Sequence, residues 1–77
     1  MITPFITVAM ATHDSSAHDR IHEIAASCNG ITVSTVTTNN CTYIAKYCYP
    51  SINDRAQCSL LLRMYRADIK VFEHEHG

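Results

Sequence analysis

ITVSTVTTNNCTYIAKYCY is the sequence of residues 31–49, and this stretch decides the fold. Its first part, residues 31–38, is dense in the β-branched side chains that favour strands. Asn39-Asn40 follows, and asparagine tolerates the positive φ angles of a two-residue hairpin turn. Residues 41–49 return as a second strand. The stretch therefore predicts a β-hairpin in the middle of the chain.

Two helices and two further strands are predicted on either side of the hairpin. Residues 16–28 and 52–66 place apolar side chains at helical spacing, and 4–12 and about 68–75 have the composition of strands. The expected N-caps of the helices are Ser15 or Ser16 and Ser51. In the second helix the expected apolar face consists of Cys58, Leu61, Leu62 and Tyr65, widened by Leu60 and Met64.

The order of the six elements is therefore β-α-β-β-α-β. Right-handed crossovers around a central hairpin fold such a chain into a four-stranded antiparallel sheet with both helices on one face. This arrangement resembles the ferredoxin-like sandwich, an α+β architecture that hosts many unrelated functions. The resemblance covers residues 1–77 as a single domain and rests on the pattern of elements.

Composition narrows the classes of function. The formal net charge is −1, which argues against a general nucleic-acid binder. No apolar run approaches the ~20 residues of a membrane span, and no basic segment precedes the apolar N-terminal stretch, so we expect a cytoplasmic protein. Reduced cysteines are expected in that compartment, and we expect Cys28 and Cys58 to be buried on the helices.

Histidines supply one candidate site. His18 and His22 stand at i and i+4 on the first predicted helix, a spacing that can chelate a metal ion. His74 and His76 share one face of the last predicted strand. The alternative interpretation of both pairs is a polar surface, and of residues 73–76 a charged edge strand. A metal- or small-ligand-binding sensor is therefore an alternative function.

Tyrosines supply a second candidate site. Tyr43 and Tyr47 project to one face of the second hairpin strand, which lies beside the strand carrying Phe5 in this topology. RNA-recognition motifs share the topology and stack bases on aromatic side chains of those two strands. Binding of single-stranded RNA on the sheet is accordingly a second alternative. The same tyrosines also fit a partly buried core, which is the favoured interpretation, or a protein-contact surface.

Arginines supply the candidate site that the sequence favours. Arg55, Arg63 and Arg66 lie along one stripe of the second predicted helix, opposite its expected apolar face. We therefore expect them to be exposed and able to bind carboxylates or phosphates of a partner.

The function predicted from the sequence is that of a small protein-interaction module. No cofactor motif and no convincing catalytic set of residues is present, so we expect neither a cofactor nor an enzyme. The expected partner is a larger protein, acidic or part of a nucleoprotein, and a homodimer is possible in principle for so small a chain. In size and type the chain is similar to small regulators or inhibitors, including those that phages make against host machinery.

Overall fold

The protein, described by a computed structural model, contains four strands and two helices among the described residues. The structure describes residues 3–11 and 14–76, without the side chain of His76. The elements are β1 (Thr3–Ala11), α1 (Ser15–Ser27), β2 (Ile31–Thr37), β3 (Thr42–Cys48), α2 (Ile52–Tyr65) and β4 (Lys70–His76). The predicted order and the predicted β-hairpin are confirmed, with boundaries that differ by one or two residues, and the predicted end of the first strand at residue 12 lies outside the described residues.

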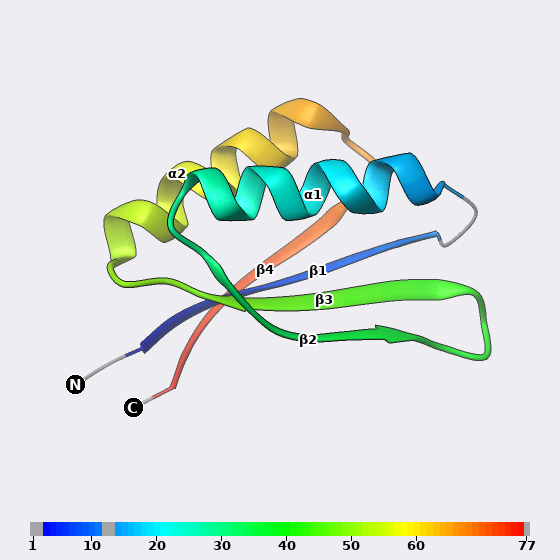
Figure 1. Cartoon of the computed structure of the whole chain (residues 1–77), viewed down its shortest axis with the longest axis horizontal. Helices are drawn as coiled ribbons and strands as arrows, with labels where there is room; N and C mark the ends of the chain where they lie inside the picture. The colour runs from blue at the N-terminus through cyan, green and yellow to red at the C-terminus, as the bar shows by residue number, and fades with distance from the viewer. Residues whose placement is uncertain (1–2, 12–13, 77) are drawn as a thin grey trace.

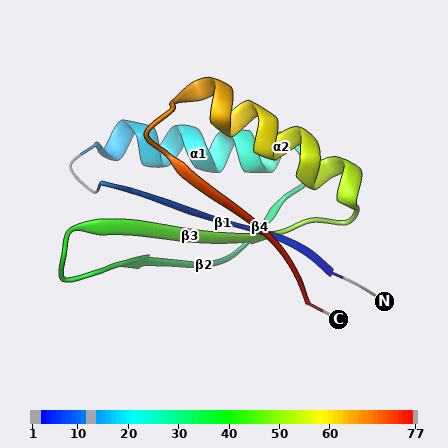
Figure 2. The ribbon, with the colours of Figure 1, turned by 180° about the vertical axis from the view of Figure 1, so that it is seen from behind.

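The strands form one antiparallel sheet in the order β2-β3-β1-β4. Both helices lie on the same side of this sheet, and its other side is open (Figure 1). The view from behind shows the same two layers (Figure 2). This is the predicted ferredoxin-like α+β arrangement. In it β1 is an inner strand, and its pairing with β4 brings Thr3 opposite His76.

Side-chain caps set where both helices begin. Asp14 caps α1 by accepting a hydrogen bond from the Ala17 amide at 3.1 Å, so the N-cap is Asp14 and not Ser15 or Ser16. Ser51 caps α2 as predicted and accepts from the Asp54 amide at 3.1 Å. At the other end of α1 the chain turns through Asn29, which has a φ of 64°. Asparagine tolerates this left-handed conformation better than most residues.

Gly30 follows this turn because the chain passes close to its neighbours there. A Cβ atom at this position would stand 2.7 Å from the carbonyl oxygen of Ala25 and 2.8 Å from the ring of Tyr49. Both distances are shorter than atoms tolerate, so a larger residue would displace the turn between α1 and β2.

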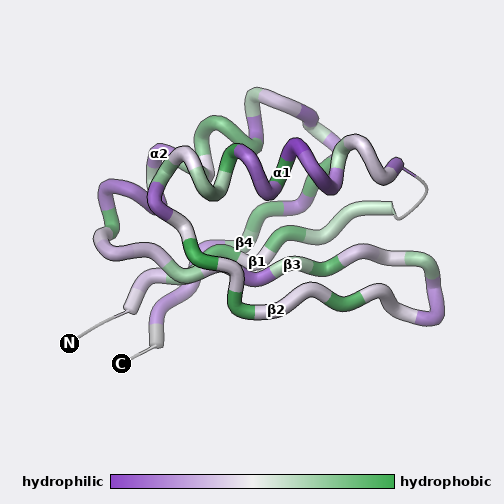
Figure 3. Tube along the Cα trace, in the orientation of Figure 1, coloured by the Kyte–Doolittle hydropathy of each residue, from purple (hydrophilic) through white to green (hydrophobic). Residues whose placement is uncertain are grey.

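The hydrophobic core fills the space between the helices and the sheet. The inward positions of β1 alternate with outward ones, as the period of a strand requires, and its core residues are Ile6, Val8 and Met10. The core residues of the helices and the remaining strands are Ala17, Ile21, Ile24, Ala25, Cys28, Tyr43, Ala45, Tyr47, Tyr49, Cys58, Leu62 and Ile69. Figure 3 shows the hydropathy of the residues along the chain.

Candidate functional site on the open face of the sheet

The strand register determines which side chains share the uncovered side of the sheet. Residues opposite each other in an antiparallel pair point to the same face, and alternate residues point to opposite faces. We call this side the open face, and its residues are Phe5, Thr7, Ala9, Ile31, Ser34, Val36, Ile44, Lys46, Cys48, Lys70, Phe72 and His74.

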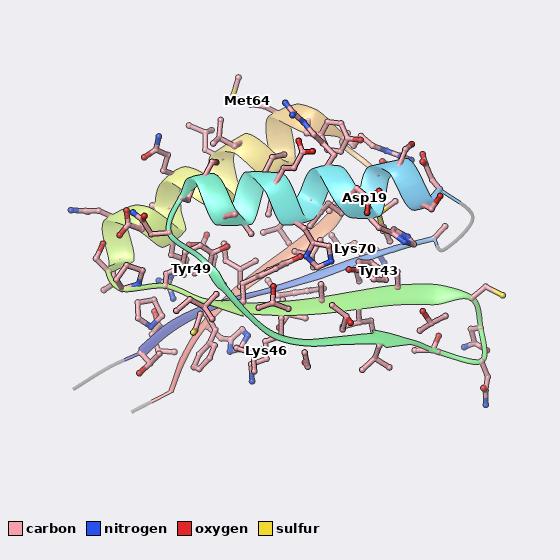
Figure 4. The ribbon with its side chains drawn as sticks, viewed as in Figure 1. Asp19, Tyr43, Lys46, Tyr49, Met64 and Lys70 are labelled. Carbon is pink, nitrogen blue, oxygen red and sulfur yellow. The ribbon has the colours of Figure 1, made fainter. Side chains whose placement is uncertain are left out.

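The open face combines apolar surface with positive charge. Phe72 is 53% exposed in the middle of β4, and Ile31 and Val36 are also exposed on β2. Lys46 and Lys70 are its ammonium groups, and Figure 4 shows Lys46 pointing away from the helices. The carboxylates of the described strands are Glu73 and Glu75, and both point to the helix side. No carboxylate of the described strands therefore neutralises the positive charge of the open face.

Phe5 lies at the centre of a cluster on this face. Its ring stacks on the His74 imidazole, with 5.4 Å between ring centroids and 11° between the ring planes. Lys46 Nζ lies 4.6 Å from the centroid of the same ring. Because β1 runs between β4 and β3, His74 and Lys46 reach the ring from the two strands that neighbour β1. Thr7 Oγ1 lies 2.9 Å from His74 Nε2 and fixes the imidazole in place.

Arg55 is buried, and the prediction that it is exposed on α2 is wrong. Its Nη1 donates a 2.8 Å hydrogen bond to the carbonyl oxygen of His74, and its Nη2 lies 2.8 Å from Glu75 Oε1. Its Nε lies 3.4 Å from Glu73 Oε2 but is not aligned for a hydrogen bond. Ion pairs with the two glutamates on the helix side of β4 therefore hold the Arg55 side chain against the sheet.

Because Arg55 faces the sheet, the residues of α2 that face the solvent differ from those that the sequence predicts. The buried residues of α2 are Arg55, Cys58, Ser59 and Leu62. The side chains of Leu60 and Met64, which were expected to widen the apolar face, are exposed, and Figure 4 shows Met64 at the outer surface. The helix thus packs a mixed polar and apolar stripe on the sheet, because β4 supplies the counter-charges.

The other two arginines of the predicted stripe also have acidic neighbours. Arg66 donates to Asp14 and to both carboxylate oxygens of Asp68, the latter at 2.9 and 2.6 Å. Hydrogen bonds from Ser16, Ala17 and Arg66 lower the pKa of Asp14, and the Arg66 hydrogen bonds lower the pKa of Asp68.

Arg63 is the exposed member of the stripe. Its nearest carboxylate oxygen belongs to Glu73, at 3.8 Å. The predicted line of three free guanidinium groups is therefore absent from the described surface of α2, because two of the three hold elements of the fold together.

Tyr43 and Tyr47 lie under α1, so their predicted place on an accessible face of the sheet is wrong. Both side chains are buried, and both hydroxyls lie 2.7 Å from a ring nitrogen of His22, Tyr43 at Nε2 and Tyr47 at Nδ1. Figure 4 shows Tyr43 on the side of β3 that faces the helices. Burial raises the pKa of both hydroxyls. The two tyrosines are core residues with satisfied hydroxyls, one of the interpretations that the sequence leaves open.

The candidate metal ligands are not brought together. His22 uses both ring nitrogens on the tyrosines, and His18 stacks on Tyr43 at 3.9 Å between ring centroids. His74 lies on the open face, across the sheet from α1, and the side chain of His76 lies outside the described residues. Within the part of the chain that the structure describes, no group of three or more metal-ligating side chains is placed to hold an ion.

Cys28 and Cys58 are buried, as the helical patterns predict. The Tyr49 hydroxyl donates to Cys58 Sγ at 2.9 Å. Burial raises the pKa of the Cys58 thiol to about 11, which keeps it protonated and a poor nucleophile at neutral pH.

Sequence reasoning missed Phe72, Lys46 and Lys70 as members of one surface. The signal that could have found them is the period-two alternation of the strands combined with the strand order. Once β1 and β3 are paired with their apolar residues inward, their outward residues are fixed, and the pairing of β4 adds Phe72 and Lys70.

Comparison with models of protein families finds no match, and comparison with curated protein sequences finds none either. Among residues 3–11 and 14–76, no helix is long and apolar enough to cross a membrane. The inference of function therefore depends on the geometry of the open face.

Proposed function

We propose that this protein is a small non-enzymatic interaction module, a regulator or inhibitor that docks on a larger protein through the open face of its sheet. The observation that supports this proposal is the composition of that face. It combines exposed apolar side chains, among them Phe72, with Lys46 and Lys70, and its strands contribute no carboxylate to it. A complementary partner surface has an apolar centre and acidic groups around it.

The surroundings of Phe5 weaken the case for single-stranded RNA, because they occupy one of the two phenylalanine rings of the open face, the other being the exposed Phe72. A base stacks on an aromatic ring only if a face of the ring is accessible. The ring of Phe5 is already stacked on His74, and Lys46 Nζ lies over it at 4.6 Å from the centroid. Two lysines are also too few for the counterion release that drives nucleic-acid binding in a chain with net charge −1.

The proposal is tested with the partner that the immobilised protein captures from a nuclease-treated lysate of its native host. Binding of that partner is measured by calorimetry for the wild type and for Lys46→Glu, Phe72→Ala and Arg63→Glu. The first two variants change the open face and are expected to weaken binding by about tenfold or more, equivalent to ~1.4 kcal/mol. Arg63→Glu changes an exposed residue on the opposite layer and serves as the matched control, with affinity expected to stay the same.

Two results would contradict the proposal. One is a loss of affinity in Arg63→Glu with wild-type affinity in Lys46→Glu and Phe72→Ala, which would place the site on α2. The other is a complex that forms only in a parallel lysate without nuclease, is abolished by nuclease and is restored by an added single-stranded oligonucleotide, which would assign the open face to nucleic acid.

A further inference from the structure

The outer edge of β2 is an unprotected strand edge. All seven residues of β2, Ile31–Thr37, are exposed on both faces of the sheet. Their sequence, ITVSTVT, contains no charged residue and no proline, two of the features that prevent an edge from pairing with another strand. The register against β3 shifts between Thr32 and Ser34, which leaves Val33 as an extra, bulged residue.

The opposite edge of the sheet, formed by β4, is protected against pairing with a further strand, in contrast to β2. β4 carries Lys70, Glu73 and Glu75 along its length, and Arg55 of α2 reaches its backbone at His74. Charged side chains of this kind discourage pairing with a further strand. β2 has strongly β-forming residues and no charged side chain along its length, and the bulge at Val33 is the one feature of this kind that it has.

We propose that β2 pairs with β2 of a second copy of the chain, around a two-fold axis, to form one continuous eight-stranded sheet. The bulge makes such a pairing possible in register. When Ile31 stands opposite Val36 of the second copy, both lie on the open face. The same register sets Thr32 opposite Thr35 of the second copy, and both lie on the helix side.

Charge allows a second copy to pair at this edge and disfavours the stacking of two open faces on each other. Two uncharged β2 strands meet without like-charge repulsion. Stacking of two open faces would instead bring Lys46 and Lys70 against a surface whose strands supply no carboxylate. Thr32 and Thr35 are exposed on the helix side, so α1 does not cover β2 and leaves room for the second copy. The pairing also joins the two open faces into one surface.

The test is analytical ultracentrifugation of the intact protein over a range of concentrations. An interface made of one strand edge is small, so dissociation is expected between about 10 and 1,000 µM. The weight-average mass of the wild type should rise from 8.6 kDa toward twice that value. The double variant Thr32→Glu/Thr35→Glu places carboxylates opposite each other across the two-fold axis and should raise the dissociation constant at least about tenfold.

Two controls make the result specific to this register. Thr32→Lys/Thr35→Glu has the same number of new charges but sets opposite charges across the axis, so it should dimerise within a few-fold of the wild type. Phe72→Lys alters the open face alone and should leave dimerisation unchanged. Circular dichroism establishes whether each variant is folded. If a variant does not fold, the mass of the wild type still tests whether the chain dimerises.

The proposal is overturned by a wild type that stays at 8.6 kDa throughout the range, whether or not β2 then binds a strand of another protein. It is equally overturned by a dimer that Phe72→Lys dissociates while Thr32→Glu/Thr35→Glu does not. The proposed register would also be refuted if Thr32→Glu/Thr35→Glu and Thr32→Lys/Thr35→Glu weakened dimerisation equally.

Discussion

Replacing Arg55 by alanine should destabilise the protein severely, because this side chain connects α2 to β4 from a buried position. The substitution removes the 2.8 Å hydrogen bond to the His74 carbonyl and the ion pairs with Glu73 and Glu75. It leaves the carbonyl oxygen without this donor and Glu75 without this cation, while Glu73 keeps Arg63 at 3.8 Å, and it opens a space where the guanidinium lay.

The expected loss is about 3–7 kcal/mol in the free energy of unfolding. A hydrogen bond from a charged donor contributes about 1.5–3 kcal/mol. Glu73 and Glu75 are 34% and 47% exposed, so solvent screens these ion pairs and each contributes only about 0.2–1 kcal/mol. Burial of the aliphatic part of Arg55 adds about 1–2 kcal/mol. The total free energy of unfolding of a 77-residue chain is about 4–12 kcal/mol, so the variant should be only marginally folded.

Urea denaturation followed by far-UV circular dichroism measures the difference. Arg63→Ala is the matched control on the same helix, because Arg63 is exposed and meets Glu73 only at 3.8 Å. Its expected cost is below about 1 kcal/mol. A cost below 1 kcal/mol for Arg55→Ala as well would refute the structural role assigned to Arg55.

Three further variants or measurements test other contacts of the core and the surface. His22→Leu removes the shared partner of two buried tyrosine hydroxyls and should cost about 1–3 kcal/mol in the same urea assay, and an unchanged midpoint would count against those bonds. At pH 8 a thiol reagent should label exposed Cys41 rapidly and Cys58 hardly at all, since the pKa of Cys58 is raised to about 11, and rapid labelling of both would contradict its burial. The pKa values of the two aspartates bonded to Arg66 are lowered from 3.8, so their stabilisation is present above that pH and is lost as the pH falls through the lowered values. Arg66→Ala should therefore lose less stability than the wild type between pH 6 and 2, and equal losses in urea midpoints would disprove the coupling.

The fold could be predicted from the sequence because its local signals agree with one another. The hairpin at residues 31–49, the serine cap of α2 and the two helical periods each indicate an element independently, and the order of elements then permits few topologies. The cap of α1 was missed because Asp14, Ser15 and Ser16 are all good capping residues, and the choice between them depends on backbone geometry.

The candidate site could not be predicted as well, because it depends on contacts between elements distant in sequence. Arg55 looks like a surface residue until the register of β4 places Glu73 and Glu75 beneath α2. Both faces of the strand containing Tyr43 carry apolar side chains, and only the packing of α1, through His22, decides which face is inside. Helical and strand periods identify faces, whereas the partner of each face is a property of the tertiary structure.

The inner position of β1 has a consequence for how the protein is made. β1 is synthesised first, yet one of its two neighbours in the sheet is β4, and the pair joins Thr3 to His76. Contacts between residues so distant in sequence close a long loop and form slowly. Until Lys70–His76 has left the ribosome, β1 has an unpaired edge and the nascent sheet is incomplete. Folding of this domain is therefore completed after β4 is synthesised, and in that interval a chaperone has an exposed strand to bind.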